Sequence, residues 1–473
     1  HRDLHSFPTR RSSDLWASVA TNIYDGLTYR GPDTKLVPGL ATAWEELDKG
    51  LRLRFTLREG VVFHNGEPFN AEAVKFTFDR LLGEEGKKGP QRSNYAAIKS
   101  VEVVDAKTVD FLLSQPDPVL LTKLAGYGAM IVPPKYVTEK GDDYFNAHPV
   151  GTGPFQFVSY EPKVGIKLEA FAKHWGGAPK LDKLEYRFIS EPSTAVAELQ
   201  AGRVDLVIPP TIPIAMIPTL QKDPNTAIAT SASPTVCALR FNTGKGITAD
   251  ERVRTAMILG VDREAIIKTV LAGQAEPIAS FQGKLSFGND PKMKPLPFDP
   301  QKAKQLLKEA GVAPGTAVQI DVRGNDATFN EVAQAVAGYL QGIGLNATIK
   351  PYETNVLLND IIPAGKTGEM FQQLWGGWTL DYDNTAYLMY HSGEKWNPYD
   401  KDKELDALLE SQRSITDRLE REKVLQSIAQ YTAKRALEMP LYNINAIFGV
   451  SKRLKNFTPV PDSRLRLTEV TVE

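Results

Sequence analysis

The sequence has few of the residues that most often build reactive or metal-binding sites. Its 473 residues include one cysteine, Cys237, and six histidines. A single cysteine cannot form an internal disulfide, and no CxxC or HExxH spacing is present, so we expect no metal site and no cofactor. The apolar context of Cys237 (TVCAL) favours a buried, unreactive thiol over a nucleophile.

The chain also lacks an excess of charge of either sign. Its 56 Lys plus Arg are balanced by 57 Asp plus Glu, which leaves a net charge of −1. This balance gives no electrostatic basis for binding a nucleic acid or an anionic membrane, so we expect neither as a partner. No apolar run reaches the roughly 18 residues that span a bilayer. With 42% apolar residues, the length predicts two or three globular domains.

The first fifteen residues differ from the rest of the chain. His5 to Leu15 (HSFPTRRSSDL) resemble the translation of a sequencing-library adapter and contain neither apolar periodicity nor a signal-peptide core. A disordered native tail is the alternative, but a dense apolar pattern begins abruptly at Trp16. We therefore predict that residues 1–15 are not native and that the native N-terminus, with any export signal, is missing from this sequence.

From Val19 onward, strand-like and helix-like patterns are mixed. Period-two alternation predicts strands, and amphipathic segments behind acidic or amide caps predict helices. The expected strands are residues 51–57, 61–64, 101–104, 108–113, 155–160, 165–171, 204–208, 318–322 and 347–351. The expected helices are 71–82 after Asn70, 194–200 after Ser193, 251–259 after Asp250, 263–271 after Asp262, 300–310 after Asp299, 329–343 and 416–436. The strand–helix–strand order around 329–343 is typical of an α/β lobe.

No arrangement of residues in the sequence indicates catalysis. There is no GxSxG elbow, and the stretch from Gly365 to Thr367, which looks like the end of a phosphate loop, has Asp360 where the first glycine is required. The carboxylates could be paired into a hydrolase dyad, yet most are expected to cap helices or to face water. We therefore expect that the protein is not an enzyme.

Aromatic residues are concentrated between Leu374 and Tyr390 (LWGGWTLDYDNTAYLMY). Glycines between tryptophans let a backbone approach a ligand, rings provide flat apolar walls, and a neighbouring acid can hold a cationic group. A core strand with a glycine bulge, followed by an Asp-Asn turn, explains the same stretch of sequence equally well. The candidate binding residues here are Trp375, Trp378, Asp381, Tyr382 and Asp383.

Motifs spread along the chain resemble one protein family. They are YDGL at 24–27, LVPGLATAW at 36–44, FTLREGVVFHNGEPFNAEA at 55–73, PVGTGPF at 149–155, WGGAPKL at 175–181, AELQAGRVD at 197–205, FNT at 241–243, RVRTA at 252–256, DREAI at 262–266 and the helix at 299–311. From about Tyr24 to the C-terminus, the chain is similar to the extracytoplasmic solute-binding proteins of ABC importers, in the peptide/nickel branch (bacterial extracellular solute-binding protein family 5).

The resemblance implies an α/β, two-lobed periplasmic-binding-protein-like fold of type II that closes around its ligand about a hinge. Lobe I is then expected at residues 16–35, 156–241 and 443–473, with an inserted subdomain at 36–155. Lobe II is expected at 242–442, so that the chain crosses between lobes near Asn242 and Asn443. Family members begin with a strand before the Tyr24 motif, and the adapter-like segment stands in its place here.

The resemblance also implies site residues. Oligopeptide binders of this family pair the α-ammonium of the peptide with the acid of a Trp-x-x-Asp-Tyr segment, which here gives Asp381 in WTLDY at 378–382. Arg240 and Asn242 fall where a crossing strand passes beneath the cleft, and Tyr24 falls on the first lobe. A surface salt bridge for Arg240 and core packing for Tyr24 are the alternatives. Trp375 replaces an arginine that peptide binders often carry, which leaves room for a different solute.

The function implied is capture of di- or oligopeptides and delivery to an ABC permease in the membrane. A non-peptide solute (an opine, a sugar or a nickel chelate) is the alternative within this role, and a hydrolase on the same scaffold is the alternative outside it. We expect a monomer that works in the periplasm or elsewhere outside the cytoplasm, free or lipid-anchored.

Overall fold

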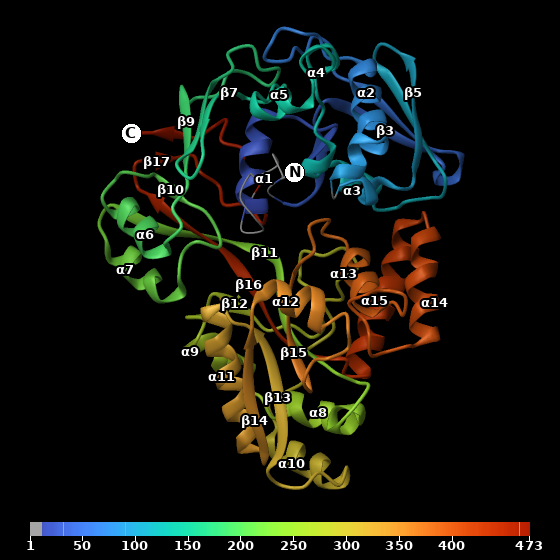
Figure 1. Ribbon diagram of the computed structural model, residues 1–473, viewed down its shortest axis with the longest axis vertical. Helices are drawn as coiled ribbons and strands as arrows, with labels where there is room; N and C mark the ends of the chain where they lie inside the picture. The colour runs from blue at the N-terminus through green and yellow to red at the C-terminus, as the bar shows by residue number, and fades with distance from the viewer. Residues whose placement is uncertain (1–11, 32, 90, 463) are drawn as a thin grey trace. The chain divides into compact units, whose positions relative to one another are not determined.

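The computed structural model describes residues 12–31, 33–89, 91–462 and 464–473, and the chain in it folds into two compact units (Figure 1). Unit 1 contains the described residues up to Ser231 together with Ala446–Glu473, and unit 2 contains Ala232–Asn445. The chain passes between the units inside two long strands, β11 (Thr226–Phe241) and β16 (Glu438–Ser451). Both crossings are therefore continuous strands and not loops.

One part of unit 1 is a four-stranded antiparallel sheet in the order β3-β4-β6-β5, with α2 packed against it. Asn70 caps α2 as predicted, because its side chain accepts a hydrogen bond from the Ala73 amide at 3.2 Å. The core between helix and sheet is aromatic: the rings of Phe78 and Phe111 meet edge to face, with their centres 4.8 Å apart. The elements are β3 (Ala41–Leu47), β4 (Arg52–Leu57), α2 (Ala71–Leu82), β5 (Ile98–Asp105) and β6 (Thr108–Leu113).

The remainder of unit 1 combines the two ends of the described chain. Helix α1 packs on the β7-β8-β9 sheet, and the C-terminal segment contributes Leu465 and Leu467 to the same core. The elements are α1 (Ser12–Ile23), β1 (Thr28–Arg30), β2 (Leu36–Pro38), α3 (Leu120–Leu124), α4 (Pro134–Lys140), α5 (Asp142–Ala147), β7 (Phe155–Glu161), β8 (Gly165–Ala170), β9 (Lys183–Arg187), α6 (Pro192–Gln200), β10 (Leu206–Val207), α7 (Ile217–Lys222), β17 (Leu454–Lys455) and β18 (Thr471–Val472).

Asp25, which is fully buried, joins these distant segments of unit 1. Its carboxylate accepts hydrogen bonds from Tyr29, from Thr152 at 2.9 Å, from Trp175 at 2.7 Å and from Arg466 at 2.8 Å. Burial opposes ionisation, but the Arg466 guanidinium and the other donors outweigh it and hold the pKa of Asp25 below its usual value. The C-terminal tail is thereby tied to the start of the fold.

Unit 2 is built on the predicted strand–helix–strand unit. Strands β13 (Thr316–Arg323) and β14 (Leu345–Tyr352) are parallel, and α11 (Ala327–Gly342) connects them and packs against both. The sheet continues through β15 (Met370–Gly376) and β11 to β16, with β12 (Ala275–Glu276) on the far side of β16. Helices α8 (Glu251–Leu259), α9 (Arg263–Thr269) and α10 (Pro300–Glu309) contribute to the core around α11.

A second core of unit 2 contains the aromatic segment. Helices α13 (Tyr382–Tyr390), α14 (Lys403–Ser411) and α15 (Arg418–Lys434) contact one another and cover Val236 and Ala238 of β11. The short α12 (Thr354–Val356) follows β14. Cys237, on the other face of β11, is fully buried as predicted, and burial raises the pKa of its thiol.

Two local predictions from the sequence are wrong. Residues 61–64 form only an isolated bridge between Val62 and Pro68 and not a strand. Helix α6 begins at Pro192 with Glu191 at its cap position, so Ser193 lies inside the first turn. A proline at the first helical position already has the required φ angle, which outweighs the capping preference of the serine. Helix α1 begins at Ser12, inside the segment predicted to be non-native, and residues 1–11 lie outside the described ranges, so the non-native origin of residues 1–15 stays a prediction.

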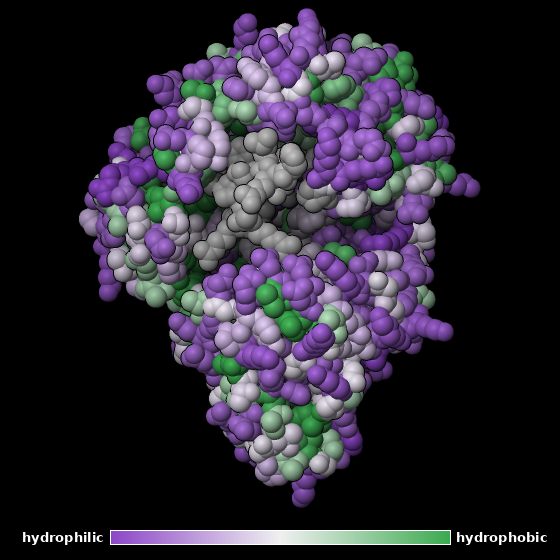
Figure 2. Space-filling view, viewed as in Figure 1, coloured by the Kyte–Doolittle hydropathy of each residue, from purple (hydrophilic) through white to green (hydrophobic). Residues whose placement is uncertain are grey.

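The face drawn in Figure 2 carries mostly hydrophilic residues where it is coloured. On the face drawn in Figure 2, apolar residues occur in small separate groups on each unit. In the described ranges, no helix is both long and apolar enough to cross a membrane.

Candidate functional site

The aromatic segment predicted as a binding site forms the end of β15, a turn and the start of α13. Gly376 ends the strand at a close approach, since a Cβ there would lie 3.2 Å from the Thr235 hydroxyl oxygen. Leu380 has a φ angle of 52°, and α13 starts two residues later. The segment is therefore a strand end and a tight turn that lead into a helix.

Asp381 lies at the N-cap of α13 and is closely paired inside unit 2. Its Oδ1 accepts from the Asp383 amide at 3.0 Å, and its two oxygens accept from Arg421 of α15 at 2.7 and 2.6 Å. The side chains of Asp381 and Arg421 are 4% and 3% exposed. A carboxylate offers about four acceptor positions, so one position, on Oδ2, is left by these contacts.

Asp383 forms a second pair with an arginine. Its oxygens accept from Arg413 at 2.7 and 3.1 Å, and Gln412 donates to Oδ1 as well. The guanidinium of Arg413 lies 3.3 Å from the centre of the Tyr387 ring and is 41% exposed. Both acids of the segment are thus engaged by arginines that follow α14 in sequence.

The two tryptophans of the segment are half-buried, whereas Tyr382 is fully buried. Trp375 packs with Val236 and Ala238 on β11, and its indole N–H, which is buried, has no hydrogen-bond partner among the described residues. Trp378 lies in the turn before Asp381. Among the candidate binding residues of the segment, the partly exposed rings are therefore those of Trp375 and Trp378.

Arg240 and Asn242 lie on β11 and just beyond it. Arg240 is 4% exposed, donates to the Trp396 carbonyl oxygen at 2.9 Å and lies over the rings of Phe371 and Tyr390. The ladder pairs Arg240 with Phe371 and Val236 with Trp375, which places Arg240 on the same face as Trp375, about 13 Å along the strand. Arg240 is therefore not the surface salt bridge weighed above, because it is buried among aromatic rings.

Asn242 has local partners. Its Nδ2 donates to the Thr367 carbonyl oxygen at 3.3 Å, and its Oδ1 accepts from the Gly244 amide at 3.1 Å. These contacts hold the chain where it leaves β11.

Tyr24 lies in unit 1 and is 7% exposed. Its ring packs edge-on against that of Phe145, with the ring centres 6.3 Å apart, and burial raises the pKa of its hydroxyl. These contacts are those of a core residue, which was the alternative for this position.

Two charged residues near the segment were missed by sequence reasoning. Arg421 lies 40 positions after Asp381, and the fully buried Glu438 begins β16 beside Arg240. Burial raises the pKa of Glu438, and the positive charge of Arg240 opposes that shift. No spacing in the sequence indicates either residue, because Arg421 and Glu438 lie far along the chain from Asp381 and Arg240 and come near them only in the folded unit. Within the described ranges, no group of three His, Cys, Asp or Glu is arranged to hold a metal ion.

The fold and the segment together define a class of protein: a two-lobed α/β binding protein with a mixed sheet in its second unit and two strand crossings. Comparison with known families identifies which one. Residues 35–397 match the model of the bacterial extracellular solute-binding proteins, family 5. The chain belongs to this family, whose members are the solute-binding components of ABC importers and work outside the cytoplasm with a membrane permease.

Similar proteins match nearly the whole chain. The glutathione-binding protein GsiB of Salmonella typhi is 28% identical over 466 residues, covering 96% of this chain and 90% of its own. The crystal structure of the ABC transporter substrate-binding protein CtaP of Listeria monocytogenes superposes with a TM-score of 0.89 at 25% identity, covering 97% and 95% of the two chains. The periplasmic binding protein DppA of Helicobacter pylori, in complex with the peptide STSA, gives 0.77 at 26% identity and covers 97% and 96%.

Proposed function

We propose that this chain captures short peptides and delivers them to its permease. The observation that carries the proposal is the full-length similarity to GsiB, which is named for binding glutathione, itself a short peptide. The similarity to DppA, whose solved structure is a complex with the peptide STSA, supports the same solute class. Non-peptide solutes remain competitors, to be separated by the experiment below.

The proposed contacts lie in the segment from Leu374 to Asp383. Trp375 and Trp378 would provide apolar walls for the peptide, and the remaining acceptor position of Asp381 would receive the α-ammonium group. Arg421 would stay bound to Asp381 and hold it in place. Tyr382 and Asp383 would fix the start of α13, Arg240 and Asn242 would fix β11, and Tyr24 would support the first lobe from its core.

We further propose the lobe division and mechanism that the family resemblance implies. Lobe I would comprise residues 16–35, 156–241 and 443–473 with the subdomain 36–155 inserted, and lobe II would comprise 242–442. A solute that binds the closed form better than the open form shifts the chain toward closure, and a shift from 1:99 to 99:1 takes roughly 5.5 kcal/mol of differential affinity. The chain would act as a monomer on the extracytoplasmic side and would release its solute unchanged.

The test is a thermal-shift screen of the purified protein against matched solutes. We expect glutathione and tri- and tetrapeptides to raise the melting temperature, since a ligand at 100 times its Kd adds about 2.7 kcal/mol to the free energy of unfolding. An opine, a sugar and a nickel–histidine chelate serve as the non-peptide arm. A shift with any of these and with no peptide would contradict the proposed solute, and mass spectrometry showing cleaved peptides after incubation would contradict a pure binding role.

A further inference from the structure

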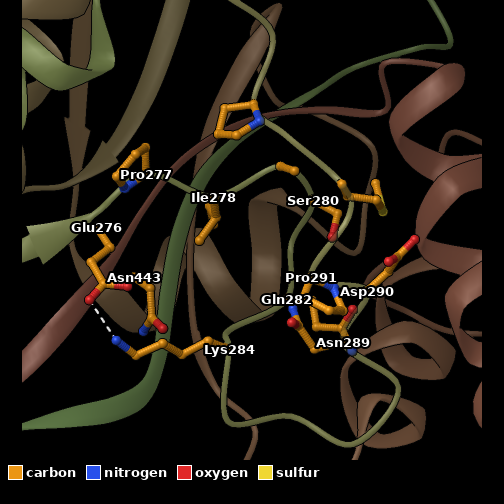
Figure 3. A pocket seen from close by; sticks show the side chains of 13 residues that line it. Glu276, Pro277, Ile278, Ser280, Gln282, Lys284, Asn289, Asp290, Pro291 and Asn443 are labelled. Atoms are coloured by element: carbon orange, nitrogen blue, oxygen red, sulfur yellow. Dashed lines mark hydrogen bonds and ion pairs between the residues drawn. The ribbon is translucent and has the colours of Figure 1, made fainter.

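A pocket in unit 2 lies beside β12 and β16. Its cavity volume is about 110 Å³, and the loop of residues 276–295 forms most of its wall. Figure 3 shows the lining side chains, with the ion pair between Glu276 and Lys284 at one side and Gln282 near Asn289 and Pro291 at the other. Asn443 of β16 completes the wall. The space is large enough for several waters or one small polar group.

The wall of this pocket is fixed by buried residues of its own loop. Ile278 and Phe281 are buried in the core beneath α13 and α15. Phe287 pairs with Asp381 through backbone hydrogen bonds at 2.8 and 3.2 Å that join it to Leu380 and Tyr382. The loop and the aromatic turn therefore belong to one connected structure, and the pocket is preformed.

Gln282 is the unusual residue in the wall. It is 4% exposed, and neither its amide nitrogen nor its amide oxygen has a hydrogen-bond partner in the part of the chain that the structure describes. A buried primary amide without partners costs free energy, and native proteins satisfy such groups with water or ligand. Gln282 thus presents one donor group and one acceptor group to whatever fills the pocket.

Asn443 has a fixed orientation on the Glu276 side of the pocket. Its Nδ2 donates both hydrogens, to the carbonyl oxygens of Ser233 at 2.9 Å and Thr235 at 2.7 Å. Its Oδ1 is turned toward Gly283, where a Cβ would lie only 3.0 Å away. Any larger residue at position 283 would therefore crowd this oxygen.

The charged side chains of the wall are already neutralised or engaged. Lys284 and Glu276 pair at 2.5 Å, while Asp290 accepts from the Lys292 amide and from Gln430, both at 2.9 Å. A carboxylate entering the pocket would satisfy the nitrogen of Gln282 and leave its oxygen facing a negative charge. An ammonium would satisfy the oxygen of Gln282 and leave its nitrogen facing a positive charge. A neutral group with a donor and an acceptor side by side satisfies both ends.

We propose that this pocket is a subsite for a carboxamide group of the solute, as carried by glutamine or asparagine. The group would form a paired amide–amide contact with Gln282, with the oxygen of Asn443 as a further acceptor. This inference rests on the proposed function and adds the chemical group that the site prefers. The carboxamide can arrive on a free amino acid or on a peptide, and the experiment separates the two sources.

The test measures Kd by calorimetry for matched pairs: Gly-Gln against Gly-Glu and Gly-Met, Gln-Gly against Glu-Gly, and free L-glutamine against L-glutamate. We expect the carboxamide member to bind about tenfold more tightly in at least one pair. Gln282→Met keeps the size of the side chain and removes both hydrogen-bonding groups, so it should bring that ratio close to one. The matched control is Gln305→Met, which changes an exposed glutamine on α10.

The outcomes distinguish the carboxamide subsite from the proposed capture of short peptides. A preference that is seen with peptides only assigns the carboxamide to a peptide residue, and one seen with L-glutamine assigns it to the free amino acid. Peptides that bind equally across the pairs, or a preference that survives in Gln282→Met, would overturn the subsite and leave the proposed function standing. Binding of none of these compounds would overturn both, and a crystal structure of a bound complex with only water at Gln282 would overturn the subsite directly.

Discussion

Asp381 and Asp383 are two residues apart and both pair with arginine, but their partners differ in exposure. Arg421 is 3% exposed, and Arg413 is 41% exposed. Removing one partner of a buried pair leaves an uncompensated charge in the interior, whereas a partly exposed guanidinium can be rehydrated. The two acids therefore form a matched pair of sites at which the same substitution has different consequences.

We predict that Asp381→Asn lowers the free energy of unfolding by about 3–5 kcal/mol and Asp383→Asn by about 1 kcal/mol. Asparagine caps helices as well as aspartate does, so the cap itself is retained. Urea denaturation measures both values. Binding is compared in the same proteins. Wild type and Asp383→Asn should bind a free tripeptide more tightly than its N-acetyl form, and Asp381→Asn should bind the two forms equally. Equal selectivity in all three proteins would contradict an ammonium contact at Asp381.

At the scale of elements, helix α11 shows how a cap can also hold a sheet. The Oδ1 atom of Asp326 accepts from the Phe329 amide at 3.0 Å, and its Oδ2 accepts from Gln372 of β15 at 2.9 Å. Among the described residues, Asp299 makes only the capping contact, in which it accepts from the Lys302 amide of α10 at 2.9 Å. Because Gln372 is fully buried, loss of Asp326 would also leave its amide without that partner.

We predict that Asp326→Ala costs about 2 kcal/mol and Asp299→Ala about 1 kcal/mol, since the first loses a cap and a buried hydrogen bond and the second only a cap. Chemical denaturation of the two variants beside wild type gives the comparison. Equal losses would mean that the contact with Gln372 contributes nothing measurable.

The helices α2, α6, α8, α9, α10, α11 and α15 were predicted from the sequence, whereas helices such as α13 and α14, and the contacts of all of them, were not. Asn70, Asp250, Asp262 and Asp299 cap the helices expected, because a cap is a contact with backbone two or three residues away. The parallel pair β13 and β14 also matched. The segment from Trp375 to Asp383 was located by its letters alone, yet its ion pairs reach residues 30 and 40 positions later. No sequence pattern indicated Gln282, because its lack of hydrogen-bond partners arises only in the folded pocket wall.

At the scale of the whole molecule, the two units should respond differently to acid. In unit 1, His64 lies with Nε2 3.0 Å from the Gly153 carbonyl oxygen, and its Nδ1 accepts from the Gly151 amide at 3.3 Å. These partners fit the neutral ring. Burial lowers the pKa of His64 to about 4, against the hydrogen bond to Gly153, and burial also lowers the pKa of His174 in the same unit.

Between about pH 6.5 and pH 4, the unfolded chain binds a proton at His64 that the folded unit does not. The free energy of unfolding of unit 1 should therefore fall with decreasing pH across that window, with about 2 kcal/mol of the loss between pH 7 and pH 5 for this residue. Hydrogen exchange at pH 7 and pH 5, mapped to residues of each unit, measures the effect. His64→Gln should reduce the pH dependence, and His148→Gln, at an exposed site, should leave it unchanged. Loss of protection that is equal in the two units would contradict the assignment to unit 1.

The sequence by itself determined the family, the capped helices, the parallel strand–helix–strand unit, the buried cysteine and the stretch of chain that carries the aromatic residues. These follow from patterns within a few residues or from motifs in a fixed order. Only the tertiary structure decided which side chains are engaged: Asp381 by Arg421, Asp25 by Arg466, and Gln282 by none of the described residues. The reason is physical, since the free energy of a buried polar group depends on partners brought to it by packing, and those partners lie far away along the chain.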